Sequence, residues 1–321
     1  MDNNTKKGLI FGVVGVFFIG FQPVVANARP ESLDAFIFAA MTCLVEASIF
    51  LPLMSLELKV NRSKFKKSNN KNQINKDSIW NNWKKNLSLL TFIGIIFALN
   101  QLLFFIGYGL AGAINGSLTQ KTSIFFGLLF GYLILKERFT KIQIIFSLTL
   151  FLGLLLAISQ GSFLYFFEIN FKIVIGVLIL LFITCLWMFG HTMTKPLFKR
   201  DEITPTQMVF LRNTLSGVIL IILYFIFFPV ENFKLFLDPI NIFFFIAMGA
   251  VYGIGLFSWY KTLSYLEVSK ATIVLSPTPI VSAIFATLIL GEVFTIFHLI
   301  GTIIVIISII IIVNQKKIES Q

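Results

Sequence analysis

Apolar runs of about twenty residues recur along almost the whole chain and constrain its fold more than any other feature. A transmembrane helix needs roughly 20 mostly apolar residues to cross the hydrocarbon core of a bilayer. Of the 321 residues, 57% are hydrophobic and 13% are charged, and the mean hydropathy is +0.88, which is more apolar surface than a soluble domain of this size can bury. The sequence therefore predicts an all-α membrane protein with ten transmembrane helices, at approximately residues 8–27, 33–56, 87–109, 113–135, 142–160, 173–194, 205–228, 239–260, 269–290 and 296–313.

The basic residues outside these runs indicate how the helices are oriented. When the N-terminus is placed in the cytoplasm, the segments on the outer side hold only Arg29, Lys172 and Lys234, and the other loop lysines and arginines fall inside. Cytoplasmic loops of membrane proteins carry an excess of Lys and Arg. We therefore expect a multi-pass protein of the plasma or inner membrane with both termini cytoplasmic, and we attribute the net charge of +11 to topology and not to nucleic-acid binding.

The longest polar stretch, residues 58–86, is rich in Asn and Lys. A segment of this composition cannot bury a core, so it is predicted to be a disordered cytoplasmic loop. Its charge could contact anionic lipid, with Trp80 and Trp83 at the level of the headgroups.

A stretch in the second half of the chain repeats the design of one in the first half. Residues 272–295 form an apolar run that ends near Gly291-Glu292, and residues 117–140 form a similar run in which Glu137 takes the place of Glu292. Such a recurrence indicates an internal duplication.

The duplication divides the chain into two predicted repeats, residues 1–160 and 161–321. Five helices per repeat is an odd number, so the second repeat enters the membrane upside down relative to the first. Inverted repeats allow a transporter to open a central site to either side of the membrane by alternating access. A duplicated membrane protein need not transport, and this alternative stays open.

Several short motifs lie in the order seen in one transporter superfamily. Ser276-Pro277 and Gly291-Glu292 resemble the proline and the Gly-Glu pair of its fourth repeat helix, and Arg212 resembles the arginine of its second. Further resembling positions are Ile19-Gly20, Phe189-Gly190 and Trp259 to Leu263. On these residues the chain resembles the drug/metabolite transporter superfamily in its ten-helix form with two EamA-type repeats. The resemblance implies a permease, often an exporter of amino acids, other metabolites or toxic compounds, and some relatives exchange phosphorylated or nucleotide-linked sugars.

The first repeat departs from the pattern of the second. Lys121-Thr122 stands where the second repeat has Ser276-Pro277, and Thr42 and Glu46 lie near the position that corresponds to Arg212. Family-wide substrate contacts therefore cannot simply be copied onto this chain.

Three charged residues lie inside apolar runs: Glu46, Lys121 and Arg212. A charge in the membrane interior costs roughly 2.5–3.5 kcal/mol on insertion scales, so each needs a partner or a wet cavity. Glu46 and Lys121 both fall near the midplane and could meet, either as a structural ion pair or as part of a substrate cavity. In a cavity, Lys121 would attract a carboxylate or phosphate, and Glu46 would hold an amino group or carry a coupling proton.

Arg212 lies about seven residues into its helix. It could bind substrate, bind backbone carbonyls or extend back to the membrane surface. The sequence does not choose between these roles.

Uncharged polar residues are concentrated in the first, third and fourth predicted helices, around Lys121. Asn100, Gln101 and Gln120 suggest a cavity, although hydrogen bonds between helices would explain any one of them. Tyr252 and Trp259 are candidate walls of this cavity. The two histidines, His191 and His298, are interpreted as packing or interfacial residues.

Proline and glycine residues predict bends and close contacts. Pro277 and Pro279 should bend the ninth span and free a backbone carbonyl one turn earlier, and we interpret this bend as an aid to gating. The glycine pairs with GxxxG spacing are expected to let helices pack closely, and they could include a homodimer face. These pairs are Gly8/Gly12, Gly127/Gly131 and Gly249/Gly253.

The combined expectation is a permease that moves small polar metabolites, amino acids or related compounds, across the bilayer by alternating access, with export favoured by the resemblance and proton coupling as a hypothesis. One alternative is an exchanger of phosphorylated or nucleotide-linked anions. Another is a membrane-embedded enzyme or a non-transporting membrane protein. The sequence has no metal-ligand cluster, nucleophile–base pair or phosphate-binding glycine loop, and Cys43 and Cys185 lack metal-type spacing, so we expect no enzyme, cofactor or metal.

Overall fold

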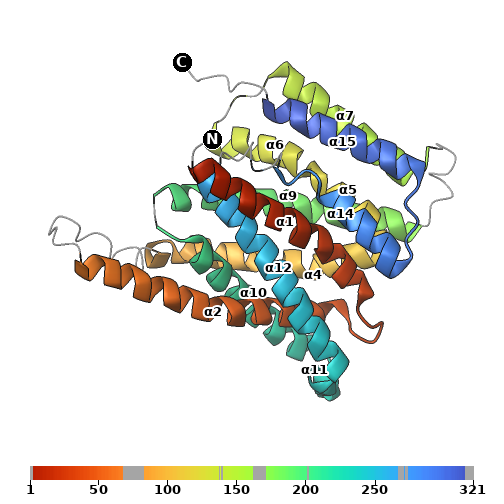
Figure 1. Cartoon of the computed structure of the whole chain (residues 1–321). Helices are drawn as coiled ribbons and strands as arrows, with labels where there is room; N and C mark the ends of the chain where they lie inside the picture. The colour runs from red at the N-terminus through yellow and green to blue at the C-terminus, as the bar shows by residue number, and fades with distance from the viewer. Residues whose placement is uncertain are drawn as a thin grey trace.

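The computed structural model describes residues 3–67, 83–136, 138, 140–161, 171–200, 202–266, 271 and 274–314. All regular secondary structure in these residues is helical, which confirms the all-α prediction. The long helices run side by side across the molecule (Figure 1). Their bounds are α1 (Asn3–Ala28), α2 (Ala35–Lys67), α4 (Leu87–Ala111), α5 (Ala113–Thr119), α6 (Ser123–Leu135), α7 (Lys141–Ile158), α9 (Phe171–Lys199), α10 (Pro205–Phe227), α11 (Lys234–Leu237), α12 (Pro239–Tyr265), α14 (Thr278–Phe285) and α15 (Ile296–Asn314).

Seven of the described helices are long and apolar enough to cross a membrane: α1, α2, α4, α7, α9, α10 and α12. Two further apolar helical stretches, Thr278–Leu290 and Ile296–Ile312, are shorter. The count of ten spans stays a prediction.

Two of the expected spans are interrupted, whereas the sequence predicted a bend in one of them, the span with Pro277 and Pro279. The span expected at 113–135 consists of α5, a 3-10 turn at Gln120–Thr122 and α6. The span expected at 269–290 has a turn at 275–277 before α14 and a π-helical turn at Ala286–Leu290 after it. The prolines account for the break before α14, because a proline has no N–H to offer the carbonyl four residues earlier. The first half of one broken span, α5, packs against α14 of the other.

Helix α2 continues to Lys67, beyond its predicted end at residue 56. The prediction of a disordered loop from residue 58 is therefore wrong for the first part of that segment. Lys and Arg are good helix formers, and extending an existing helix costs far less than starting one. Trp83 packs beside the buried cluster that contains Leu90, and residues 68–82, which include Trp80, lie outside the described residues.

The helices pack in pairs that connect the two halves of the chain. α1 lies along α12, α4 along α9, α2 along α10, and α7 along α15. In each pair one helix comes before residue 160 and the other after residue 170. The pairs α1–α12 and α4–α9 also correspond, since each joins the first long helix of one half to the third of the other. The protein interior is therefore built between the halves.

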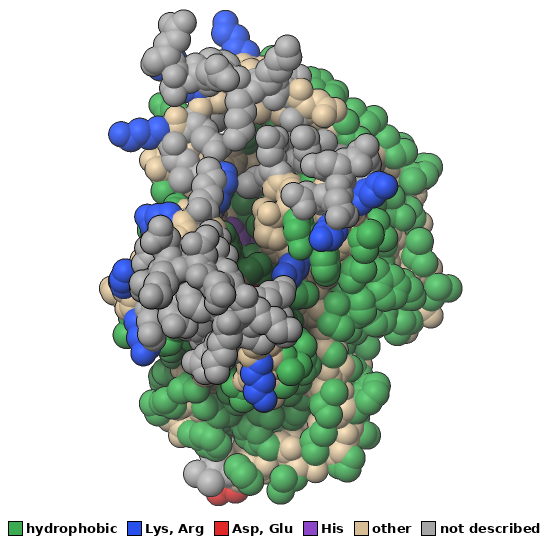
Figure 2. Space-filling model, turned by 60° about the vertical axis from the view of Figure 1, so that its left-hand side comes forward, with side chains coloured by type: hydrophobic (Ala, Val, Ile, Leu, Met, Phe, Trp, Pro, Cys, Tyr) green, Lys and Arg blue, Asp and Glu red, His purple; other side chains and the backbone are tan. Residues whose placement is uncertain are grey.

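The two ends of the helical bundle differ in charge. We call one end, where α1, α4, α7 and α10 begin, the basic end, and the opposite end, where α5, α9, α12 and α15 begin, the far end (Figure 1). Figure 2 shows the molecule from the side of the basic end, with Lys and Arg side chains around a hollow that has a histidine inside it. The flank beside the hollow is covered with hydrophobic side chains, as expected for a surface in contact with lipid.

Candidate functional site

Glu46 lies fully buried on α2, where this helix packs along α10. Its Oε2 accepts a hydrogen bond of 2.6 Å from Nδ2 of Asn213 on α10. Its Oε1 has no hydrogen-bond partner among the described residues. Glycine allows neighbouring helices to come this close, because a Cβ at Gly253 of α12 would lie 3.4 Å from Cγ of Glu46. The carboxylate is thus held by one oxygen, and the other is available.

Arg212 is 3% exposed, so it does not extend to the membrane surface. Its Nε and one terminal nitrogen both donate to Oδ1 of Asn213 at 3.2 Å. The guanidinium also lies over the ring of Phe97 on α4, 4.2 Å from the ring centroid, in cation–π geometry. Asn213 therefore links the buried cation to the buried carboxylate, a role that the sequence did not single out.

Aromatic rings surround this charged group. Tyr252 is buried, with its ring 5.6 Å from that of Phe104. The His191 ring lies 5.6 Å from the rings of Phe97 and Tyr260 and 6.3 Å from that of Trp259. We call these rings the aromatic lining; Tyr252, Trp259 and His191 belong to it, and the role of Tyr252 and Trp259 as walls of a cavity stays a prediction.

Asn100 and Gln101 lie on α4, about one turn beyond Phe97, and both are buried. Neither amide atom of Asn100 has a hydrogen-bond partner in the described part of the chain, and the same holds for Nε2 of Gln101. An unsatisfied buried polar group costs about 1–3 kcal/mol, so such groups usually mark a place for water or a ligand. We define the central site as Glu46, Arg212 and Asn213 with Asn100 and Gln101.

Lys121 lies in the 3-10 turn between α5 and α6, and its Nζ donates to the carbonyl oxygen of Leu275 at 2.9 Å. Leu275 precedes Pro279 by four residues, so its carbonyl lacks the donor that a continuous α-helix would supply; besides Lys121 it accepts from the Thr278 N–H, at 3.3 Å. Lys121 and Glu46 thus have different partners, and no ion pair joins them among the described residues. The neighbouring Gln120 has an unpartnered Nε2.

Pro277 and Pro279 bend the chain as expected, and the structure shows what the bend faces. The freed carbonyl points to Lys121 of the other broken span and so avoids lipid. The bend therefore ties the two interrupted spans together.

A sequence profile described as the EamA-like transporter family matches residues 6–159 and, a second time, residues 173–314. The chain belongs to the EamA-like transporter family. The two matches confirm the resemblance to a two-repeat permease of the drug/metabolite type, and EamA-like proteins are membrane transporters. This chain is therefore a multi-pass membrane protein whose class of function is transport.

Structural comparison agrees with the fold of an EamA-like protein. The chain matches 27 solved chains. One of them, described as "Crystal structure of protein", has a TM-score of 0.64 at 12% sequence identity, with 95% of this chain and 96% of that chain covered. This likeness shows a shared fold alone. A comparison with curated proteins gave no match.

The Gly291-Glu292 pair of this EamA-like chain joins two elements at the far end. Gly291 has φ of 68°, a left-handed conformation that glycine adopts without strain. The two carboxylate oxygens of Glu292 accept hydrogen bonds from the backbone N–H groups of Ala113 and Ile114, at 2.7 and 2.9 Å. The sequence pointed to this pair by its recurrence but did not reveal the contact.

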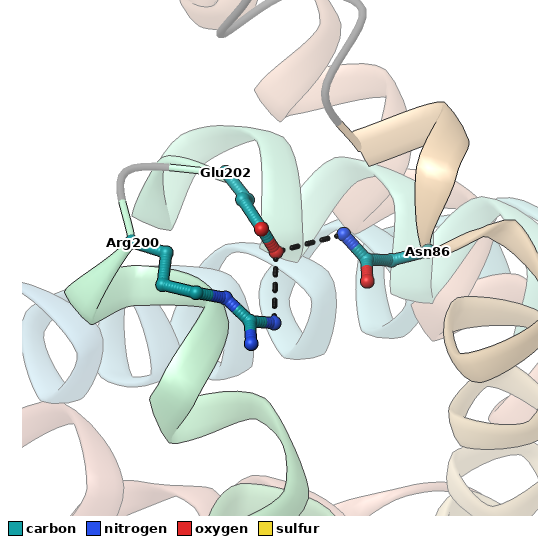
Figure 3. A network of polar contacts seen from close by, with 3 residues as sticks. All are labelled: Asn86, Arg200 and Glu202. Atoms are coloured by element: carbon teal, nitrogen blue, oxygen red, sulfur yellow. Dashed lines mark hydrogen bonds and ion pairs between the residues drawn. The ribbon is translucent and has the colours of Figure 1, made fainter.

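A polar network ties helices together at the basic end. Figure 3 shows Oε2 of Glu202 between Asn86, which donates from Nδ2 at 2.9 Å, and Arg200, at 3.0 Å. Thr204 donates to Oε2 of Glu57 at 3.1 Å, which joins the start of α10 to α2. The Arg200 side chain is 56% exposed, so this ion pair contributes little to stability.

Four glycines of the predicted GxxxG pairs pack inside the molecule. A Cβ at Gly8 would meet Leu266, and one at Gly12 would meet Val274; at Gly249 and Gly253 it would meet Val45 and Phe50. The expectation of close helix packing is correct for these glycines. They face neighbouring segments of the same chain and so provide no homodimer face.

Proposed function

We propose that this EamA-like protein moves small zwitterionic metabolites, amino acids among them, and that the central site binds them. The observation that carries the proposal is the buried pairing of Glu46 and Arg212 through Asn213. The free oxygen of Glu46 can accept a hydrogen bond from an ammonium group, and Arg212 can hold a carboxylate. A ligand with both groups would satisfy the two charges together, which the membrane interior otherwise penalises.

The aromatic lining supports a substrate with an apolar or flat side chain. Rings beside the charged groups offer a desolvated surface of the kind found in small-molecule sites. The unpartnered amides of Asn100 and Gln101 supply further hydrogen-bond donors and acceptors.

Alternating access is supported by how the two halves are arranged. α1 starts at the basic end, whereas α9, the first long helix of the second half, starts at the far end (Figure 1). Inverted repeats of this kind place a substrate site near the middle of the membrane. The two broken spans meet near that level, and they are our candidate for the part that moves.

We assign the basic end to the cytoplasm, on the positive-inside rule. The hollow in Figure 2 then opens to the cytoplasm, and a substrate loaded from that side would be exported. Glu46 is our candidate carrier of a coupling proton, because its Oε1 is unpartnered and its other oxygen has a neutral partner.

An exchanger of phosphorylated anions is the second candidate. It would need Lys121 to face the anion, but the Lys121 ammonium donates to the Leu275 carbonyl. This contact favours the zwitterion proposal over the anion proposal.

The test is solute counterflow in proteoliposomes that contain the purified protein. We expect saturable exchange of labelled amino acids, with a loss of at least about tenfold in Glu46→Gln, which removes a buried charge, and in Arg212→Lys, which keeps the charge but loses the planar fork that binds a carboxylate with two hydrogen bonds. Glu231→Gln is the matched control, because Glu231 is exposed at the far end, and it should transport like the wild type. Exchange of sugar phosphates with no amino-acid flux would support the anion exchanger instead. Unchanged amino-acid flux in both Glu46→Gln and Arg212→Lys would show that the central site does not bind the substrate.

A further inference from the structure

Two helices of this protein begin with the same hydrogen-bonded arrangement, a capping box in which a Thr and a Gln bond to each other's backbone. At the start of α7, the Thr140 N–H donates to Oε1 of Gln143 at 2.9 Å, and the Gln143 N–H donates to Oγ1 of Thr140 at 3.2 Å. Thr204 and Gln207 form the same box at the start of α10. In both cases the third residue of the helix must supply a side-chain acceptor.

Helix α15 begins with a box in which histidine takes the place of glutamine. The Thr295 N–H donates to Nδ1 of His298 at 3.2 Å, and the His298 N–H donates to Oγ1 of Thr295 at 3.3 Å. Thr295 and His298 have the same spacing as Thr140 and Gln143, and they begin the helix that pairs with α7. The two ends of the α7–α15 pair thus carry a glutamine box and a histidine box.

The contacts of His298 determine which ring nitrogen carries the proton. Because the Thr295 N–H points at Nδ1, that nitrogen must present a lone pair. Nε2 then carries the hydrogen, and Oδ1 of Asn115 on α5 accepts it at 3.1 Å. The amide nitrogen of Gln160, 3.2 Å from the same Nε2, donates to the carbonyl of Ala157 at 2.7 Å. The neutral ring therefore bridges the start of α15 and the first half of a broken span.

Protonation of the ring breaks one of the two bonds that make this box, the bond from the Thr295 N–H to Nδ1. With hydrogens on both nitrogens, Nδ1–H would donate to Oγ1 of Thr295, which lies 3.0 Å away, and the Thr295 N–H would lose its acceptor. A positive charge in the first turn of a helix is also unfavourable, because the helix dipole places partial positive charge there. A glutamine in the same position never meets this conflict.

The described elements that surround His298 contain one ionisable side chain besides the histidine itself. α5 and residues 159–161 contain no ionisable side chain, and in residues 291–297 the ionisable one is Glu292. Both carboxylate oxygens of Glu292 already accept hydrogen bonds from the start of α5. Phe294 stacks on the imidazole, with ring centroids 5.8 Å apart.

We propose that His298 makes the far-end attachment of α15 sensitive to protons: the neutral ring closes the capping box and holds Asn115 of α5, and protonation of Nδ1 opens the box and loosens this attachment. The proton comes from the solvent at the far end. The basic end of the same helix pair has Gln143 and stays closed. This proton-sensitive capping box lies outside the central site, so the proposal does not depend on which substrate that site binds.

The first test reads the ring directly. The chain has two histidines, so the protein with isotope-labelled histidine gives two sets of imidazole signals by NMR, and His298→Gln identifies which set is His298. We expect the tautomer with hydrogen on Nε2 near neutral pH and the doubly protonated ring in acid, within the range from about pH 8 to about pH 5. A hydrogen on Nδ1 at the upper pH, or a ring that stays neutral throughout, would overturn the proposal.

The second test reads the movement. Val293 is 74% exposed and Glu231 is also exposed, so spin labels on cysteines at these two positions, with Cys43 and Cys185 replaced by Ala, report a distance across the far end. We expect the distance distribution to shift between about pH 8 and about pH 5 in the otherwise wild-type protein and to stay fixed in His298→Gln. His298→Gln should fold, because the Gln143 box shows that glutamine fits this position. The same shift in His298→Gln, or no shift in either protein, contradicts the proposal.

Discussion

At the level of single residues, Asn213 holds the central site together. It donates from Nδ2 to Glu46 and accepts at Oδ1 from Arg212, so one neutral amide satisfies two opposite charges. Carboxamides are suited to this task because they offer a donor and an acceptor on one planar group. Either charge alone in the membrane interior would be costly.

We predict that Asn213→Ala destabilises the protein by about 1–3 kcal/mol, because it leaves a buried donor and a buried acceptor without their partner. The measurement is thermal unfolding in detergent, with substrate counterflow in parallel. Thr214→Ala is the matched control, since the Thr214 hydroxyl bonds only to Phe210 O of its own helix among the described residues. Equal stability of the two variants would show that the hydrogen bonds of Asn213 to Glu46 and Arg212 do not stabilise the protein.

The sequence indicated the charged members of this site and missed their connector. Glu46 and Arg212 are conspicuous because charges are rare in apolar runs, whereas an asparagine beside an arginine is not. Which residue meets which depends on the rotation and offset of packed helices, and a single sequence does not specify these. For the same reason the sequence left open whether Glu46 and Lys121 meet, and in the structure each has a separate partner.

At the level of elements, the two broken spans support each other. Pro279 removes the N–H that the Leu275 carbonyl would use in a continuous helix, and Lys121 of the other span supplies a donor instead. A positive charge is thereby held in the membrane interior by a backbone dipole. The contact makes the shape of one span depend on the other.

We expect Lys121→Met to destabilise the protein by about 1–3 kcal/mol, because the Leu275 carbonyl would lose its charged donor. Pro279→Ala restores a backbone N–H, so the double variant should lose less than the sum of the two single variants, by an interaction energy of about 0.5–3 kcal/mol. Denaturation of the four proteins in a double-mutant cycle measures this difference. Additive losses would mean that Lys121 and the proline break act independently.

The sequence predicted the break in one span and missed the break in the other. Pro277 and Pro279 predicted a bend, and they also predicted a carbonyl without its helical donor, because proline has no N–H. Gln120–Thr122 has no proline or glycine, so a 3-10 turn there has no local signal. Its shape comes from packing against α9 and from the bond of Lys121 to the Leu275 carbonyl, which only the folded chain provides.

At the level of the whole molecule, charge at the two ends predicts a single orientation. We expect a membrane-impermeant thiol reagent to label Glu231→Cys in intact cells and to label Lys261→Cys only after the membrane is opened, in a background with Cys43 and Cys185 replaced by Ala. The reason is that Lys261 lies near the basic end of α12, which the positive-inside rule places in the cytoplasm. The opposite labelling pattern would reverse the proposed topology and, with it, the proposed direction of transport.

The overall architecture could be predicted further than the site. Long apolar runs, the recurrence of a Gly-Glu design and the distribution of Lys and Arg led to a two-repeat, all-α membrane protein. The length of α2 did not follow from hydropathy, because that helix continues through polar residues to Lys67. Hydropathy records where a chain meets lipid, and it carries little information on where a helix ends in water.

The pairing of α7 with α15 has a consequence for how the protein is made. α7 buries Leu150 and Leu154 and packs most closely on α15, with Gly153 of one helix against Gly301 of the other. Ribosomes complete α7 long before α15, because α9, α10, α12 and α14 lie between them in the chain. Until α15 is inserted, the face of α7 that carries Gly153 therefore meets lipid tails, and α15 replaces that lipid when it packs on α7.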